Sequence, residues 1–179
     1  MTNKILAVLL FLTLPAFARA DSQWVLKQST LTYHVSHPLH EAEGASHAAR
    51  GKGDCHAGEC NFLIAAPVKS FDSGNSNRDL HMLQITRGAQ FPMVIVRIRL
   101  PEKELESPTI HANLKIWFAG QNAEYKQVPL KRVAKGNQME VSGTIPLKCS
   151  DFKITRPELL AMPIKDEVPV TLDTTWIAQ

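Results

Sequence analysis

The chain has 179 residues, of which 44% are hydrophobic and 21% are charged, and its formal net charge is +3. Its lysines and arginines are scattered rather than gathered in a basic stripe with aromatic residues, which argues against a nucleic-acid partner. Because no linker, internal repeat or low-complexity stretch divides it, we expect one domain with a hydrophobic core.

The first twenty residues have the three-part pattern of a cleavable signal peptide. Lys4 precedes an apolar run over residues 5–14, and Ala18-Arg19-Ala20 forms an A-x-A cleavage site. A retained membrane anchor is the weaker interpretation, because this run is shorter than the roughly twenty residues that span a bilayer. A lipid anchor is weaker still, because no Cys stands near the cleavage point. We therefore expect a signal peptide over residues 1–20, no integral membrane anchor after cleavage, and an exported domain over residues 21–179 with net charge +1.

Alternation of apolar and polar residues with a period of two dominates the rest of the chain and predicts β-strands. Strands are expected at residues 24–26, 31–35, 42–53, 60–66, 91–100, 109–118, 127–133, 139–147 and 168–178. Short helices are expected at residues 77–83, capped by Ser76 or Asn77, and at residues 157–161, which begin with a proline. About eight antiparallel strands, each with one apolar face, predict a sheet that closes into a barrel or packs on a second sheet. A barrel of this size either fills with side chains or holds one small ligand.

Three cysteines follow the expected cleavage site. Cys55 and Cys60 flank the sequence His-Ala-Gly-Glu, so they can face each other across a hairpin. We predict a disulfide there, with a pair of reduced thiols as the alternative. Its short loop limits the expected stabilisation to about 2 kcal/mol in the chain-entropy model. Cys149 is left unpaired, and we interpret it as a small buried hydrophobe rather than a nucleophile.

The histidines do not predict a metal site. His34, His37 and His40 are spaced by three, and His47 and His56 follow. A strand places residues three apart on opposite faces, and a proline interrupts any helix here, so we expect solvated loop histidines at the rim of the barrel, with a metal site in this segment as the weaker alternative. The chain also contains no G-x-S-x-G elbow, zinc-protease motif, Walker loop or dinucleotide fingerprint. We therefore predict no catalytic residues, no metal and no cofactor.

Two longer motifs and an opening strand carry a family resemblance. Residues 71–83 read Phe-Asp-Ser-Gly-Asn-Ser-Asn-Arg-Asp-Leu-His-Met-Leu and precede Phe91-Pro92 and an alternating strand. Residues 151–160 read Asp-Phe-Lys-Ile-Thr-Arg-Pro-Glu-Leu-Leu, and residues 164–168 read Ile-Lys-Asp-Glu-Val. With Trp24, Ser29 and Leu31 fitting its opening strand, the chain resembles the YceI-like family over essentially all of residues 21–179.

The resemblance implies an all-β fold, namely an eight-stranded antiparallel, extended lipocalin-like barrel with one or two short helices, exported to the periplasm. It also implies an apolar channel for a polyisoprenoid, a quinone or another long-chain amphipathic lipid. The expected ligand-binding residues are Phe71, Met82, Leu83, Phe91, Val94, Val96, Leu114, Ile116, Phe118, Val141, Phe152 and Ile154. Arg78, Asp79 and His81 are candidates for contacts with a polar head group. The alternative, which we favour slightly, is that Arg78 and Asp79 tie the helix to the barrel.

Three functions are compatible with this sequence. The first is a periplasmic binding or carrier protein for an isoprenoid-type lipid. The second is an enzyme acting on such a lipid, with His81 or Cys149 as candidate residues. The third is a ligand-free structural or stress-related module whose barrel is filled by its own side chains. The ligand head group, the partner proteins and the formation of a homodimer stay open.

Overall fold

A computed structural model describes residues 22–179 of the chain. The predicted signal peptide over residues 1–20 lies outside the described residues. The strands, in chain order, are β1 (Ser22–His37), β2 (His40–Ser46), β3 (Arg50–His56), β4 (Glu59–Pro67), β5 (Met93–Pro101), β6 (Thr109–Phe118), β7 (Gln121–Lys135), β8 (Gln138–Lys148), β9 (Glu158–Leu159), β10 (Met162–Pro163) and β11 (Glu167–Ala178). The helices are α1 (Ser76–Ile85) and three short 3₁₀ turns, η1 (Val68–Ser70), η2 (Glu102–Glu106) and η3 (Ser150–Phe152).

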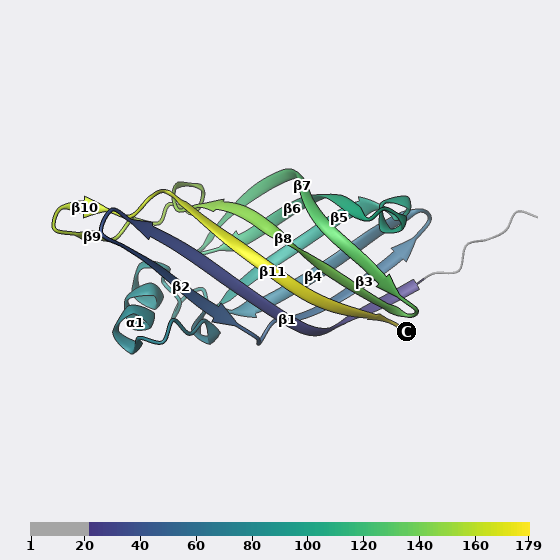
Figure 1. The fold of residues 1–179 in the computed structure, drawn as a ribbon, viewed down its shortest axis with the longest axis horizontal. Helices are drawn as coiled ribbons and strands as arrows, with labels where there is room; N and C mark the ends of the chain where they lie inside the picture. The colour runs from purple at the N-terminus through teal and green to yellow at the C-terminus, as the bar shows by residue number, and fades with distance from the viewer. Residues whose placement is uncertain (1–21) are drawn as a thin grey trace, which may run out of the picture.

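The main sheet closes on itself, which confirms the predicted eight-stranded antiparallel barrel. Its strands follow the order β11-β8-β7-β6-β5-β4-β3-β1, and β1 pairs with β11 to complete the ring. In this closing pair Leu31 lies opposite Leu172, so the apolar faces of the first and last strands meet on the same side of the sheet. Closure gives these strands partners on both sides and so removes the free edges that an open sheet would expose. Figure 1 shows the elongated barrel that results.

The main sheet has a ninth strand, β2, which pairs with β1 on the same side as β3 does. The alternation predicted one strand over residues 42–53, but the chain bends at residues 47–49 and forms β2 and β3 instead. Ser46 stabilises the bend, because its hydroxyl accepts a hydrogen bond from the Ala48 amide at 3.3 Å and contacts the Ser70 hydroxyl at 2.7 Å. Just before the bend, Ala45 of β2 exchanges two 2.9 Å backbone hydrogen bonds with Asp72. The outer edge of β2 is therefore held by the segment that leads into α1.

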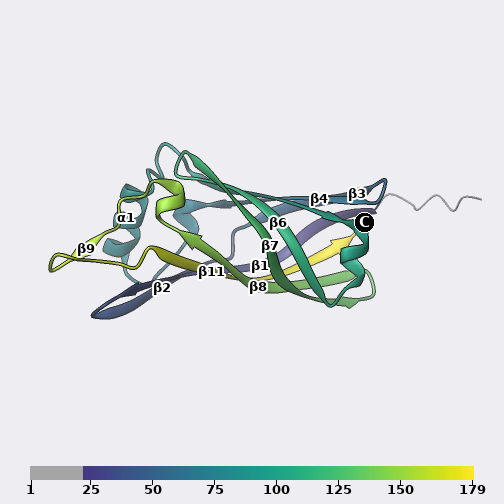
Figure 2. The ribbon, with the colours of Figure 1, turned by 90° about the horizontal axis from the view of Figure 1, so that it is seen from above.

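The helix α1 lies at the same end of the barrel as the turn between β1 and β2 (Figures 1 and 2). It begins at Ser76, one residue before the predicted start, and its N-cap is Asn75 rather than Ser76 or Asn77, because the Asn75 side chain accepts from the Arg78 amide at 3.1 Å. It ends two residues later than predicted, where the Thr86 hydroxyl donates to the Met82 carbonyl at 2.7 Å. The β3–β4 hairpin lies at the opposite end (Figure 2).

The prediction of a second helix at residues 157–161 is wrong. This segment forms the small hairpin of β9 and β10, in which the Ile164 amide donates to the Pro157 carbonyl at 3.0 Å. The fixed φ of proline suits the first turn of a helix, but it also suits the extended residue that begins a strand. Local sequence alone therefore did not distinguish the two structures.

The predicted disulfide between Cys55 and Cys60 is confirmed. The two residues lie directly opposite each other in the β3–β4 hairpin, their Cα atoms 4.0 Å apart, and both are buried. The disulfide lies near η2, because the Glu102 amide donates to the carbonyl of Gly58 in the hairpin turn. It therefore fastens the end of the barrel that faces away from α1.

Candidate functional site

The barrel encloses an apolar cavity of about 220 Å³. Its wall is formed by side chains from β1, β4, β5, β6, β7, β8 and β11, together with residues of α1, of η2 and of the segment after β8. The lining residues on β6 extend from Ile110 to Phe118, which is roughly 26 Å along the strand at about 3.3 Å per residue. The cavity is therefore long as well as apolar.

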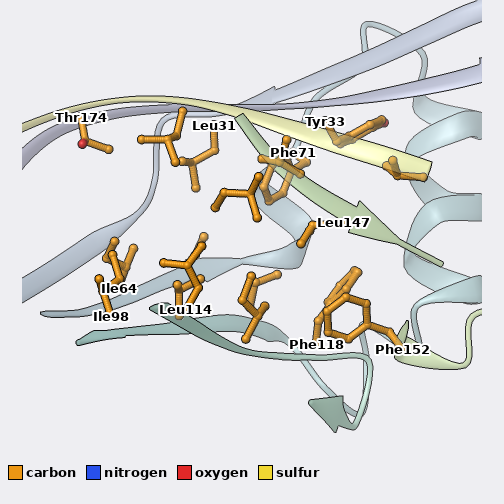
Figure 3. Close-up of a pocket in the computed structure, with 18 of the residues that line it drawn as sticks. Leu31, Tyr33, Ile64, Phe71, Ile98, Leu114, Phe118, Leu147, Phe152 and Thr174 are labelled. Carbon is orange, nitrogen blue, oxygen red and sulfur yellow. The ribbon is translucent and has the colours of Figure 1, made fainter. Parts of the chain in front are cut away.

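Strand alternation explains why the wall is almost free of polar groups. On β11 the inward residues are Val168, Val170, Leu172, Thr174 and Trp176, and their neighbours point outward. Figure 3 shows the same arrangement on opposite walls, with Leu31 and Leu147 across the space from Ile98 and Leu114. The Thr174 hydroxyl is satisfied within the wall, because it donates to the Val141 carbonyl at 2.9 Å and accepts from the Trp176 indole at 3.2 Å.

The two ends of the cavity differ in exposure. The lining residues near η2 and the β7–β8 turn are buried, with exposed fractions of 8% or less: Leu105, Ile110, Leu130, Met139 and Trp176. The lining residues near α1 are partly exposed: Tyr33, Val35, Met82, Ile85, Ile154 and Ile164. The cavity is therefore closed near η2, and its mouth lies at the α1 end.

A polar cluster stands beside this mouth. Arg78 donates from Nε to the Ser73 hydroxyl at 2.9 Å and from Nη2 to the Ser73 carbonyl at 2.6 Å. The Ser73 hydroxyl in turn donates to Asp79 Oδ1 at 2.5 Å. Arg78 and Asp79 thus attach α1 to the loop that precedes it.

Tyr33 belongs to both the cavity wall and this cluster. Burial raises the pKa of its phenol, and the nearby Asp79 carboxylate raises it further, while the hydrogen bond with Ser73 and the Arg78 charge act in the opposite direction. Its ring packs 5.9 Å from that of Phe71 and covers Gly44, where an added Cβ would lie 2.6 Å from the Tyr33 ring. Tyr33 therefore presents an apolar ring to the cavity and a neutral hydroxyl to the rim.

The expected ligand-binding residues fall into two groups. The cavity wall includes Phe71, Met82, Val94, Val96, Leu114, Ile116, Phe118, Val141, Phe152 and Ile154. Leu83 and Phe91 are not part of the wall. Leu83 packs against Gly88, and Phe91 lies between Gly120 and the Arg87 guanidinium, which is 4.9 Å from its ring centre.

Other wall residues were missed from the sequence. They include Leu31, Tyr33 and Val35 on β1 and the inward residues of β11. Their alternation was visible in both strands. Only closure of the ring, however, brings the first and last strands to the same cavity.

The two residues considered for catalysis do not form an activated pair. His81 is exposed on α1, whereas Cys149 is buried in the cavity wall. Burial raises the pKa of the Cys149 thiol, and the Asp166 carboxylate raises it further, so the thiol stays protonated at neutral pH. Cys149 therefore occupies the wall as the small buried hydrophobe that the sequence predicts.

Three of the histidines that we expected to be solvated make hydrogen-bond contacts within the protein. His37 is buried rather than solvated, since its ring contacts the Leu39 amide and the Met162 carbonyl. His34 contacts the Thr171 hydroxyl, and His47 contacts the Thr30 hydroxyl. Within residues 22–179, no group of three or more His, Cys, Asp or Glu side chains is placed to hold a metal ion. The same residues include no helix of sufficient length and hydrophobicity to cross a membrane.

The barrel is similar to solved structures of other proteins. A crystal structure of BcnA from Burkholderia cenocepacia superposes with a TM-score of 0.68 at 16% identity, covering 82% of this chain and 95% of that one. A polyisoprenoid binding domain from Saccharophagus degradans, described as implicated in plant cell wall breakdown, gives a TM-score of 0.67 at 16% identity over 87% and 98% of the two chains. At such low identity these similarities establish the fold. A search of curated proteins found no match.

The closed antiparallel barrel with an apolar interior, open at one end, defines a lipocalin-like protein. The sequence also matches the family model of the YceI-like domain over residues 24–176. The chain therefore belongs to the YceI-like family, which confirms the resemblance drawn from its two motifs.

Proposed function

We propose that this protein binds a polyisoprenoid, or another long-chain amphipathic lipid, inside the barrel. The observation that carries the proposal is the cavity itself, which is long, apolar and open at the α1 end. The structural similarity to a protein described as a polyisoprenoid binding domain supports this class of ligand. On this view the side chains of the cavity wall are the ligand-binding residues.

The dimensions of the cavity are compatible with such a ligand. An engineered apolar cavity of about 150 Å³ is large enough to bind benzene, and this cavity is larger, at about 220 Å³. Each buried CH₂ group contributes about 0.8 kcal/mol to binding, so a chain of several isoprene units gains enough free energy for a stable complex. The cavity also argues against the ligand-free module, in which side chains would fill the barrel.

The polar end of the lipid would lie at the mouth. Arg78 is the cationic residue of the polar cluster beside the mouth, and a guanidinium suits a phosphate or another oxygen-rich head group. Since Arg78 also holds Ser73, we propose that a head group contacts an arginine that is already in position. Asp79 orients this arrangement, and His81 is exposed on the same helix.

We further propose that the protein works as a periplasmic carrier. The signal peptide predicted over residues 1–20 supports export, and the Cys55–Cys60 disulfide supports an oxidising compartment. A water-insoluble lipid that must cross an aqueous space between two membranes needs a closed container, which a barrel provides.

Native mass spectrometry of the protein purified from its own periplasm tests the proposal. We expect a bound lipid, and we expect the emptied protein to take up a polyprenyl lipid delivered from ethanol. The variant Ile98→Trp should fill the cavity and lower uptake at least about tenfold. The matched control Arg99→Trp changes the next residue, which is exposed on the outer face of β5, and should leave uptake unchanged. A wild-type protein that is empty and takes up no lipid would overturn the proposal.

The same preparation distinguishes a carrier from an enzyme. We expect the recovered lipid to keep its mass and structure after prolonged incubation with the wild type, with Cys149→Ala and with His81→Ala. A chemically altered lipid, formed by the wild-type protein and not by one of these variants, would favour an enzyme instead.

A further inference from the structure

Large hydrophobic side chains are exposed around the mouth of the cavity. Leu160 is 76% exposed, Leu80 is 59%, Leu39 is 57% and Leu159 is 47%. They belong to the β9–β10 hairpin, to α1 and to the β1–β2 turn, which all lie at the same end of the barrel in both views (Figures 1 and 2). Exposed apolar side chains therefore border the mouth, just as apolar side chains line the cavity behind it.

The β9–β10 turn holds its leucine outward at an energetic cost. Its two central residues, Leu160 and Ala161, have φ values of 53° and 62°. A two-residue turn with positive φ at both positions strongly favours Asn-Gly, because residues with larger side chains are strained there. The sequence has Leu-Ala at these positions, although Asn-Gly would make the turn more stable in water. Strain at an exposed apolar tip points to a function for that tip.

The two leucine-bearing turns are fixed to each other by a buried histidine. His37 Nδ1 accepts a hydrogen bond from the Leu39 amide at 3.1 Å, so its Nε2 carries the proton and donates to the Met162 carbonyl at 2.9 Å. The Lys165 amide adds a 2.8 Å hydrogen bond to the Ser36 carbonyl. The turns therefore present their leucines as one preorganised surface.

We propose that Leu39, Leu80, Leu159 and Leu160 form a docking surface that inserts into the interface of a phospholipid bilayer. This proposal rests on the proposed function, because a lipid that leaves a membrane for the cavity through a docked mouth avoids contact with water. The four leucines are together called the leucine rim.

The charges beside the rim indicate which bilayer it fits. Residues 153–167 carry three basic side chains and three acidic ones: Lys153, Arg156, Lys165, Glu158, Asp166 and Glu167. Because this segment has no net charge, we do not expect electrostatic attraction to anionic lipids to hold the protein on a bilayer. The leucine rim is therefore suited to a zwitterionic surface, and attachment should depend little on salt.

Flotation with phosphatidylcholine vesicles tests the docking surface directly. We expect the protein to float with the vesicles to the same extent at low and high salt. The double variant Leu159→Ser/Leu160→Ser should lower the bound fraction at least about tenfold, and Leu39→Ser should lower it less. The matched control is Leu63→Ser, because Leu63 is 50% exposed on β4 and outside the rim. Absence of wild-type flotation, or an equal loss in Leu63→Ser, would overturn the proposal.

A separate measurement keeps docking distinct from cavity binding. The rim variants should take up lipid from ethanol as the wild type does, but should take it up more slowly from vesicles. If the wild type floats but never takes up lipid, the proposed function fails and the docking surface stands. If the rim instead joins two copies of the chain, the double variant will abolish a dimer in sedimentation and leave flotation unchanged, which would contradict the proposal.

Discussion

The indole N–H of Trp176 donates to the hydroxyl of Thr174 at 3.2 Å inside the cavity wall. Both residues point inward from β11, and the Thr174 hydroxyl also donates a hydrogen bond to the Val141 carbonyl. These hydrogen bonds satisfy two polar side chains in a wall that is mostly apolar.

Replacing Thr174 with Val should therefore destabilise the protein although shape and size are kept. The change removes the acceptor of the buried Trp176 indole and the donor to the Val141 carbonyl, and an unsatisfied buried group costs about 1–3 kcal/mol. Urea denaturation followed by circular dichroism measures the loss. Thr175→Val, at the half-exposed neighbouring position, should change the free energy of unfolding by less than about 0.5 kcal/mol. Equal stability of the two variants would show that the hydrogen bonds are not needed.

Adding a side chain at Gly53 should disturb the closed end of the barrel. A Cβ there would overlap Cδ1 of Phe62, whose ring packs edge-on against Trp176 at 5.1 Å between centres. Overpacking of this kind costs about 1–3 kcal/mol, so Gly53→Ala should lower the midpoint of urea denaturation. Gly53→Ala in a Phe62→Leu background should cost less, because the smaller side chain gives way. Additive losses in this double-mutant cycle would contradict the assigned contact.

Loss of the disulfide should weaken the barrel without unfolding it. The bond closes a loop with a sequence separation of 5 residues, for which the chain-entropy model gives about 2 kcal/mol. We expect Cys55→Ala/Cys60→Ala to lower the free energy of unfolding by roughly that amount, plus a smaller loss of packing, and to keep the native circular dichroism spectrum. Reduction of the wild type with dithiothreitol provides a comparison free of packing changes. A variant that is unfolded at room temperature would show that the disulfide is essential for the fold.

Both tyrosines of the chain should titrate above their usual range. Burial raises the pKa of Tyr33 and of Tyr125, and Tyr125 also donates to Asp151 at 2.6 Å, where the carboxylate opposes ionisation. The phenols are thus held neutral in the folded protein, so their stabilisation is complete below about pH 10 and is lost as the pH rises further. Absorbance of tyrosinate at alkaline pH measures the shift. Tyr125→Phe should reduce the dependence of the unfolding free energy on pH above about 10. An ordinary titration of Tyr125 in the folded state would contradict the hydrogen bond.

Several boundaries show where sequence patterns stop being informative. β6 was predicted over its full length because its alternation is uninterrupted. β1 was predicted as two strands because a bulge between Leu26 and Gln28 places Lys27 and Gln28 both outward and breaks the alternation. The first part of β7 was missed for a similar reason, since Gln127 has a φ of 55° at a second bulge. In each case the strand continues because its partner strand holds it.

The sequence by itself determined the all-β class with about eight main strands, the Cys55–Cys60 pairing, the family and part of the cavity wall. These features depend on alternation, short-range spacing and motifs, which are local properties of the chain. Only the tertiary structure decided which end of the cavity is open, that Leu83 and Phe91 lie outside its wall, and that His37 joins two turns at the mouth. Those features depend on closure of β1 against β11 and on the packing of segments more than a hundred residues apart, which no local pattern encodes.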